Sequence, residues 1–108
     1  MEKNEYFISL QTQIGERKGK MRFVFDEMNV IGELEILNCR NSFIGKRQKN
    51  GTYKLNGSIT TLVGEMQYEA EGIIQDEYLS FTLTEGEHEY RIHGTKDIKR
   101  SKENEEIL

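Results

Sequence analysis

The chain has 108 residues, of which 35% are hydrophobic and 31% are charged, and its formal net charge at pH 7 is −4. This length fits a single domain, and the acidic balance argues against a nucleic-acid partner, because neutralising phosphates requires a basic surplus. No stretch approaches the roughly 18 apolar residues of a membrane span. The single cysteine, Cys39, excludes an internal disulfide, and together with the charged first residues it favours a cytoplasmic location.

Apolar and polar residues alternate with a period of two along most of the chain, a pattern that predicts β-strands. The predicted strands lie at 5–13, 20–28, 30–37, 43–45, 53–60, 66–74, 79–84 and 90–94. Residues 14–19 and 38–42 are predicted breaks, because charged and polar residues dominate them. Asn50 and Gly51 predict a hairpin turn, since both residues tolerate a positive φ.

Turns this short make consecutive strands antiparallel neighbours, because a parallel crossover needs a dozen or more residues. We therefore predict an all-β fold, a single small antiparallel up-and-down meander of about eight strands that is closed or nearly closed into a barrel, with a two-sheet sandwich as the alternative. Residues 1–95 form this domain, and residues 96–108 form a charged C-terminal tail. The tail is expected to be either solvated chain or a short helix on the barrel, with Ile98, Ile107 and Leu108 as its apolar residues.

Five glycines inside the predicted strands share the parity of the apolar residues in their strand. They are Gly32, Gly45, Gly57, Gly72 and Gly94. Glycine weakens a strand, because it adds backbone entropy and no packing, so five of them on the inward face indicate a geometric requirement. We interpret the requirement as strong coiling of the sheet, whose concave face leaves no room for Cβ atoms. This interpretation favours a barrel over two flat sheets.

The inward apolar side chains would largely fill an eight-stranded barrel, although such an interior can also hold one small ligand. Tyr6, Tyr53, Tyr68 and Tyr90 share the inward parity. A buried phenol needs a hydrogen-bond partner, so tyrosines converging on one end would line a half-polar pocket. Alternatively, they lie at the rims with their hydroxyls in water. The candidate ligand-binding set consists of these four tyrosines and Arg22.

Candidate catalytic and metal-binding groups are few. Cys39 lies between Asn38 and Arg40 with no histidine beside it, so we interpret it as a half-buried residue at a strand end rather than a nucleophile. His88 and His93 are five residues apart, so in one strand they face opposite sides and cannot share a metal. We therefore predict no enzyme activity, no metal site and no cofactor.

Two surface features have alternative interpretations. Basic residues at 46–49 would form a patch with Arg17, Lys18 and Lys20 if the two loops shared one barrel end. Such a patch would suit single-stranded nucleic acid, whereas isolated lysines protect strand edges from pairing. Outward apolar residues would mark a partner or dimer surface if they clustered, and need no explanation if scattered. They are Phe7, Val24, Ile31, Leu37, Ile44 and Ile73.

Over about residues 5–95, the meander with its inward glycines is similar in architecture to the calycin-like barrels, which include lipocalins, fatty-acid binders and avidin-type proteins. The tryptophans of the lipocalin and avidin signatures are absent, so the resemblance does not extend to biotin binding. We predict a non-enzymatic barrel that binds a small amphipathic ligand at a tyrosine-lined end. The alternative is a compact protein–protein interaction module, for example a homodimer, with a filled core and no ligand cavity.

Overall fold

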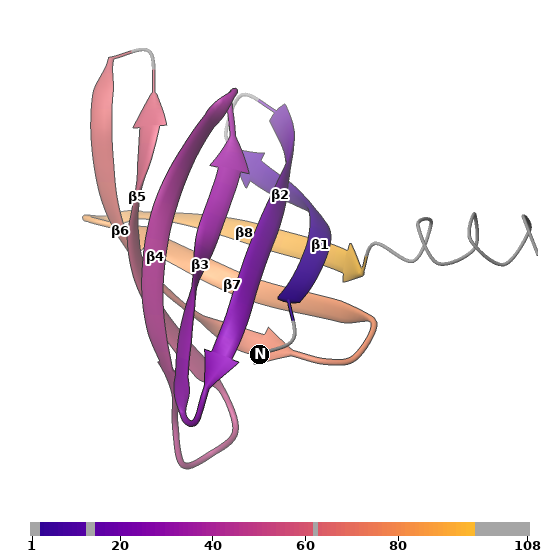
Figure 1. The fold of residues 1–108 in the computed structure, drawn as a ribbon. Coiled ribbons are helices and arrows are strands. Elements are labelled where there is room, and N and C mark those ends of the chain that lie inside the picture. The colour runs from indigo at the N-terminus through magenta and orange to yellow at the C-terminus, as the bar shows by residue number, and fades with distance from the viewer. Residues whose placement is uncertain (1–2, 13–14, 62, 97–108) are drawn as a thin grey trace, which may run out of the picture.

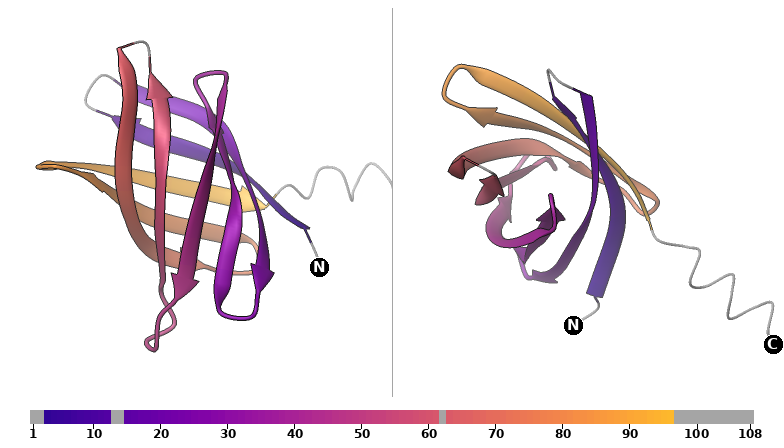
Figure 2. Two further views of the ribbon diagram at one scale, coloured as in Figure 1. Left: turned by 60° about the vertical axis from the view of Figure 1, so that its left-hand side comes forward. Right: turned by 90° about the horizontal axis from the view of Figure 1, so that it is seen from above.

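The computed structural model describes residues 3–12, 15–61 and 63–96. They form eight antiparallel strands in one closed barrel, in which each strand pairs with its sequence neighbours and β8 pairs with β1 (Figure 1, Figure 2). The strands are β1 (Lys3–Thr12), β2 (Gly15–Asp26), β3 (Asn29–Ile36), β4 (Cys39–Arg47), β5 (Tyr53–Thr61), β6 (Gly64–Ile74), β7 (Tyr78–Glu85) and β8 (His88–Lys96). The predicted up-and-down barrel is confirmed, and the β1–β8 ladder excludes a sandwich. This part of the chain contains no helix, and so none that could cross a membrane.

The structure describes one residue of the predicted tail, Lys96. Lys96 is the last residue of β8, where it pairs with Tyr6 of β1. The rest of the predicted tail, residues 97–108, lies outside the described residues.

The predicted breaks are wrong at residues 15–19 and 39–42, whereas Asn38 lies in the β3–β4 turn, as expected of a break. β2 begins at Gly15, and β4 begins at Cys39. The side chains there are mostly polar, but strand pairing uses backbone groups, which every non-proline residue supplies. Arg17 therefore pairs with Leu10 of β1, and Asn41 pairs with Leu34 of β3, in register with the apolar parts of the same strands.

The five strand glycines face the interior, as predicted. An added Cβ at Gly94 would lie 2.9 Å from side-chain atoms of both Ile8 and Leu79, and one at Gly45 would collide with the side chain of Leu55. At Gly72 the collision would be with the backbone of β7. These positions let neighbouring strands approach closely, which is how a small barrel reaches its strong curvature.

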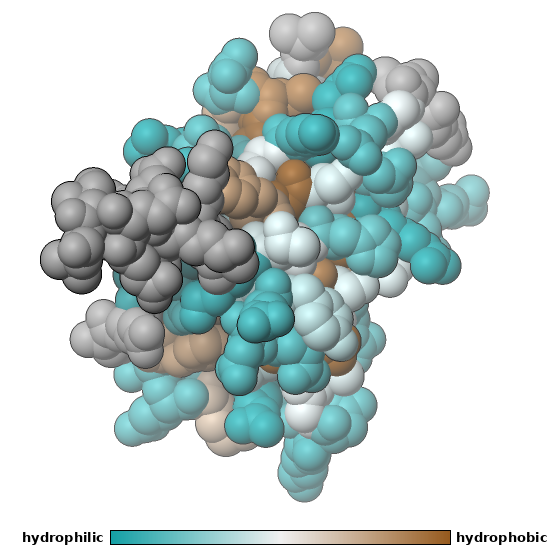
Figure 3. Space-filling view, turned by 90° about the vertical axis from the view of Figure 1, so that its right-hand side faces the viewer, coloured by the Kyte–Doolittle hydropathy of each residue, from teal (hydrophilic) through white to brown (hydrophobic). Residues whose placement is uncertain are grey.

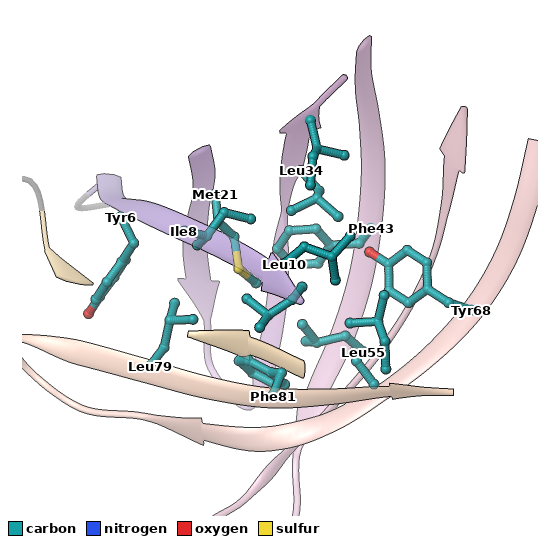
Figure 4. Packing of buried hydrophobic residues seen from close by; sticks show 14 of the residues in the cluster. Tyr6, Ile8, Leu10, Met21, Leu34, Phe43, Leu55, Tyr68, Leu79 and Phe81 are labelled. Atoms are coloured by element: carbon teal, nitrogen blue, oxygen red, sulfur yellow. The ribbon is translucent and has the colours of Figure 1, made fainter. Parts of the chain in front are cut away.

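The centre of the barrel is filled by packed hydrophobic side chains (Figure 4). Tyr6 stacks on Phe23 with ring centroids 5.5 Å apart, and Phe23 meets Phe25 edge to face. Within the described residues, no buried residue is polar or charged. Of the two expectations for the interior, a packed core therefore holds for the middle of the barrel.

The alternating connections define two ends. We call the end with the β1–β2, β3–β4, β5–β6 and β7–β8 connections the mouth, and the other end the base. At the mouth the ladders are incomplete: β4 and β5 pair only from Phe43 and Gly57 towards the base, and β6 and β7 only from Glu69 and Thr84. The β5–β6 and β7–β8 hairpins accordingly point in different directions in Figure 1. On the face shown in Figure 3, hydrophilic residues surround small hydrophobic patches.

Candidate functional site

The mouth of the barrel contains a pocket of about 620 Å³, which we call the mouth pocket. Buried Leu10 of β1 and Ile59 of β5 belong to its lining, together with Met66 of β6 and Tyr90 of β8. Leu37 and Val63, both exposed, add apolar side chains from the β3–β4 and β5–β6 turns. A concave, mainly apolar site of this volume falls in the range that small-molecule sites occupy, roughly 300–1,000 Å³.

The β3–β4 turn holds one of these apolar side chains, that of Leu37, in a backbone conformation that is uncommon for leucine. Leu37 and Asn38 have φ values of 54° and 60° and lie between the paired residues Ile36 and Cys39. Positive φ at both central residues matches the twist of the flanking strands, as in a type I′ hairpin. Asparagine tolerates this conformation, but at other non-glycine residues it costs about 1–2 kcal/mol. Leu37 is 44% exposed at the rim of the pocket, so its burial offsets that cost only in part.

Side chains replace the backbone ladder where β4 and β5 separate at the mouth. The Asn41 Nδ2 donates to Thr60 Oγ1 at 2.9 Å, and the Thr60 backbone N–H donates to Asn41 Oδ1 at 3.1 Å. Each bond of this kind contributes about 0.5–1.5 kcal/mol. The pair therefore holds the wall of the mouth pocket where main-chain pairing has ended.

Arg17 brings a charge into the apolar mouth pocket. It is half-buried in β2, opposite Leu10, and lies two and four residues before the inward-facing Gly19 and Met21. Sequence reasoning missed Arg17 because it treated residues 14–19 as a break. Extending the alternation backwards from Met21 through Gly19 would have placed Arg17 on the inward face.

Two of the predicted tyrosines lie at the base. The Tyr6 hydroxyl donates to the Gln75 backbone oxygen at 2.7 Å, and burial, followed by Asp76 and Tyr53, raises the pKa of Tyr6. The Tyr53 ring lies 5.8 Å from that of Phe25. Both tyrosines are therefore remote from the mouth pocket, which neither lines.

The other two tyrosines lie towards the mouth but not in one site. Tyr90 lines the mouth pocket. Tyr68 is buried, and it lies on the opposite side of the core from Tyr6, with its ring directed into the interior (Figure 4). It also lines a second, more polar pocket of about 450 Å³, which lies where β6 and β7 separate. Burial raises the Tyr68 pKa to about 12. The single tyrosine-lined end is thus not assembled, because residues of equal parity can lie at different heights along the barrel.

Arg22 lies on the outer surface and lines neither the mouth pocket nor the second pocket. Its Nη1 donates to Glu35 Oε1 at 2.9 Å, and its Nε lies 3.3 Å from Glu5 Oε1. The hydrogen bond to Glu35 is the largest contribution to the raised pKa of Arg22, and the same bond is the largest contribution to the lowered pKa of Glu35. Both neighbouring strands therefore supply partners of Arg22, and the structure does not bring it together with the four tyrosines of the candidate ligand-binding set.

The cysteine and one histidine line the mouth pocket. Cys39 is half-buried at the start of β4, as expected of a residue at a strand end. His88 lines the mouth pocket, while His93 is exposed beside Ser9 and Ser80. Across residues 3–12, 15–61 and 63–96, no three His, Cys, Asp or Glu side chains are grouped to hold a metal.

The two predicted surface features have different outcomes. Lys46 and Arg47 lie at the base, whereas Arg17 and Lys18 lie at the mouth, so the joint basic patch does not form.

The outward apolar residues cluster in part. Val24, Ile31 and Ile44 form one row across β2, β3 and β4, in which Ile31 and Ile44 are 48% and 62% exposed.

The fold and the pocket together define a closed eight-stranded up-and-down barrel with an apolar pocket at one end. Comparison of the chain with protein-family models, with curated proteins and with solved structures finds no match.

Proposed function

We propose that the protein is a non-enzymatic barrel that binds a small amphipathic ligand in the mouth pocket. The mouth pocket carries this proposal, because it combines an apolar floor at Leu10 and Ile59 with a volume of about 620 Å³. The middle of the barrel is packed, so the ligand binds at one end rather than along the axis. Covering this apolar surface removes it from water, which drives binding at roughly 25 cal/mol per Å² buried.

The rim of the mouth pocket supports the same proposal. Leu37 holds an apolar side chain there in a backbone conformation that glycine or asparagine would adopt more readily. A ligand that covers Leu37 would supply the burial that the side chain lacks in the free protein.

Filling the pocket tests the proposal. Met66→Trp places a bulky indole ring in the mouth pocket, and Met28→Trp makes the same change at an exposed turn of the base, where Met28 is 49% exposed. Amphipathic carboxylates, alcohols, sterols and aromatic compounds are screened by thermal shift, and hits are mapped by amide chemical shifts. We expect a hit to perturb Cys39, Thr60 and Tyr90, to lose affinity at least tenfold in Met66→Trp, and to bind Met28→Trp normally.

Either of two results contradicts the proposal. One is that no compound in the panel stabilises the wild-type protein. The other is that hits perturb residues of the base, such as Tyr6 and Tyr53, and bind Met66→Trp as well as they bind the wild type.

A second candidate function is a homodimer through the outer face of β2–β4. The row of Val24, Ile31 and Ile44 supports it, because two large apolar side chains lie side by side in solvent. Sedimentation equilibrium tests it: a dimer that dissociates in Ile44→Glu supports this function, and a monomer at all accessible concentrations contradicts it.

The proposal extends to the class and location of the protein. A closed up-and-down barrel with a pocket at one end supports a calycin-like assignment in architecture, although such a likeness does not itself determine a ligand. The single cysteine supports a cytoplasmic location, because it cannot form a disulfide within the chain, and disulfides are rare in the reducing cytosol.

A further inference from the structure

The mouth pocket has a charge of one sign only. Of the described residues that line it, Arg17 is the only one with a permanent charge, and none is Asp or Glu. The chain as a whole has 19 acidic residues against 15 basic ones. The pocket is therefore electrostatically distinct from the acidic molecule that carries it.

Arg17 has no ion-pair partner among the described residues. The carboxylate next to it, Glu16, lies 3.9 Å from Lys18 Nζ and accepts a hydrogen bond from Gln11 Nε2 at 3.1 Å. Arg17 itself donates through Nη1 to the Glu16 backbone oxygen at 3.3 Å. A guanidinium has five N–H donors in a planar fork that matches an anionic oxygen pair, so Arg17 retains donors for a ligand.

The charges around the rim favour one side of the pocket for an anion. His88 lies in the β7–β8 hairpin, which also carries Glu85, Glu87 and Glu89, and these carboxylates repel a negative group. Arg17 lies instead in β2, opposite Leu10, which belongs to the apolar lining. An acidic group next to Arg17 therefore leaves the apolar lining free for an apolar body.

We propose that the ligand is an amphipathic anion, with an apolar body that packs against Leu10 and Ile59 and one acidic group that the Arg17 guanidinium binds. This inference rests on the proposed function and adds the chemical class of the ligand. Arg17 selects this class and is not needed for binding an uncharged molecule of the same shape.

A matched pair of ligands tests the inference. Decanoate and 1-decanol have the same chain length and differ in charge, and their binding to the full chain is measured by isothermal titration calorimetry at low salt. We expect the wild type to prefer decanoate at least tenfold, which corresponds to about 1.4 kcal/mol. Arg17→Gln reduces the preference to near one, because it lowers the affinity for decanoate much more than the affinity for 1-decanol. Lys18→Gln removes the same charge from a side chain that is 84% exposed and keeps the preference.

The outcomes separate the inference from the proposed function. Equal affinities of the wild type for decanoate and 1-decanol overturn the role of Arg17 and leave the pocket proposal standing. A preference that survives in Arg17→Gln, or that is lost equally in Lys18→Gln, also overturns it. If neither ligand binds the wild type, the proposed function fails and the inference fails with it.

Discussion

Gly72 offers the sharpest test of the way in which this barrel closes. An alanine Cβ at this position would meet the backbone oxygen of Ser80 and lie 2.7 Å from the Cα of Phe81. Both atoms belong to the main chain of β7, which cannot move aside without stretching the β6–β7 ladder from Glu69 to Ile74. The clash is therefore relieved only by separating two strands of a closed sheet.

The expected cost of Gly72→Ala follows from two opposing effects. Overpacking an interior position costs about 1–3 kcal/mol, and replacing glycine with alanine recovers about 0.4–1 kcal/mol by restricting the unfolded chain. The net loss in the free energy of unfolding is thus about 1–2 kcal/mol. At about 4–8 °C per kcal/mol for a domain near this size, we expect the melting temperature to fall by roughly 5–15 °C.

Urea denaturation followed by far-ultraviolet circular dichroism measures this loss. Glu69→Ala, an exposed substitution in the same strand, is the control and should change stability by less than about 0.5 kcal/mol. The reasoning is refuted if Gly72→Ala has the same urea midpoint as the wild type, because the alanine Cβ would then find space that the strand spacing does not allow.

Three further predictions concern the mouth and the core. Asn41→Ala removes both side-chain bonds to Thr60 and should lower the free energy of unfolding by about 1–2 kcal/mol, measured in urea; no change would show that the bridge is dispensable. Leu37→Gly should relieve the strain of the positive φ and raise the free energy of unfolding by about 0.5–1 kcal/mol, while lowering the affinity of the mouth pocket for its ligand. A lower free energy of unfolding would contradict the inference that Leu37 is strained. Because burial raises the folded-state pKa of Tyr68 from 10.0 to about 12, the unfolded chain loses this proton first. Stability should therefore fall between about pH 10 and 12, and Tyr68→Phe should show a shallower fall by roughly 2–3 kcal/mol; equal slopes in both proteins would argue against this assignment.

Most of the fold could be predicted because its signal is local. An extended chain points alternate side chains to opposite faces, so the parity of Met21, Phe23 and Phe25 identifies the inner face of β2 without knowledge of its partners. The same rule assigned Gly32 and Gly94 to the interior, where the structure has them. The rule was abandoned at residues 14–19, and this is why Arg17 was missed.

The candidate site was predicted less well, because parity does not specify height along the barrel. Tyr6 and Tyr90 both face inward, yet Tyr6 bonds to Gln75 at the base and Tyr90 lines the mouth pocket. Their heights depend on strand length and on the register between strands, which backbone hydrogen bonds between distant residues set. The separation of β6 and β7 beyond Glu69 and Thr84, which forms the second pocket, has no sequence signal that we recognise.

The amino-acid sequence alone was enough to predict an all-β meander, the inward face of each strand and the glycines that let the sheet curl. Each of these features depends only on a residue and its near neighbours. Only the tertiary structure decided that the sheet closes through β1 and β8, that the core is packed in the middle, and that an apolar pocket with Arg17 at its side opens at one end. The physical reason is that closure and register are properties of paired strands, and no single strand carries the information about where its partner begins.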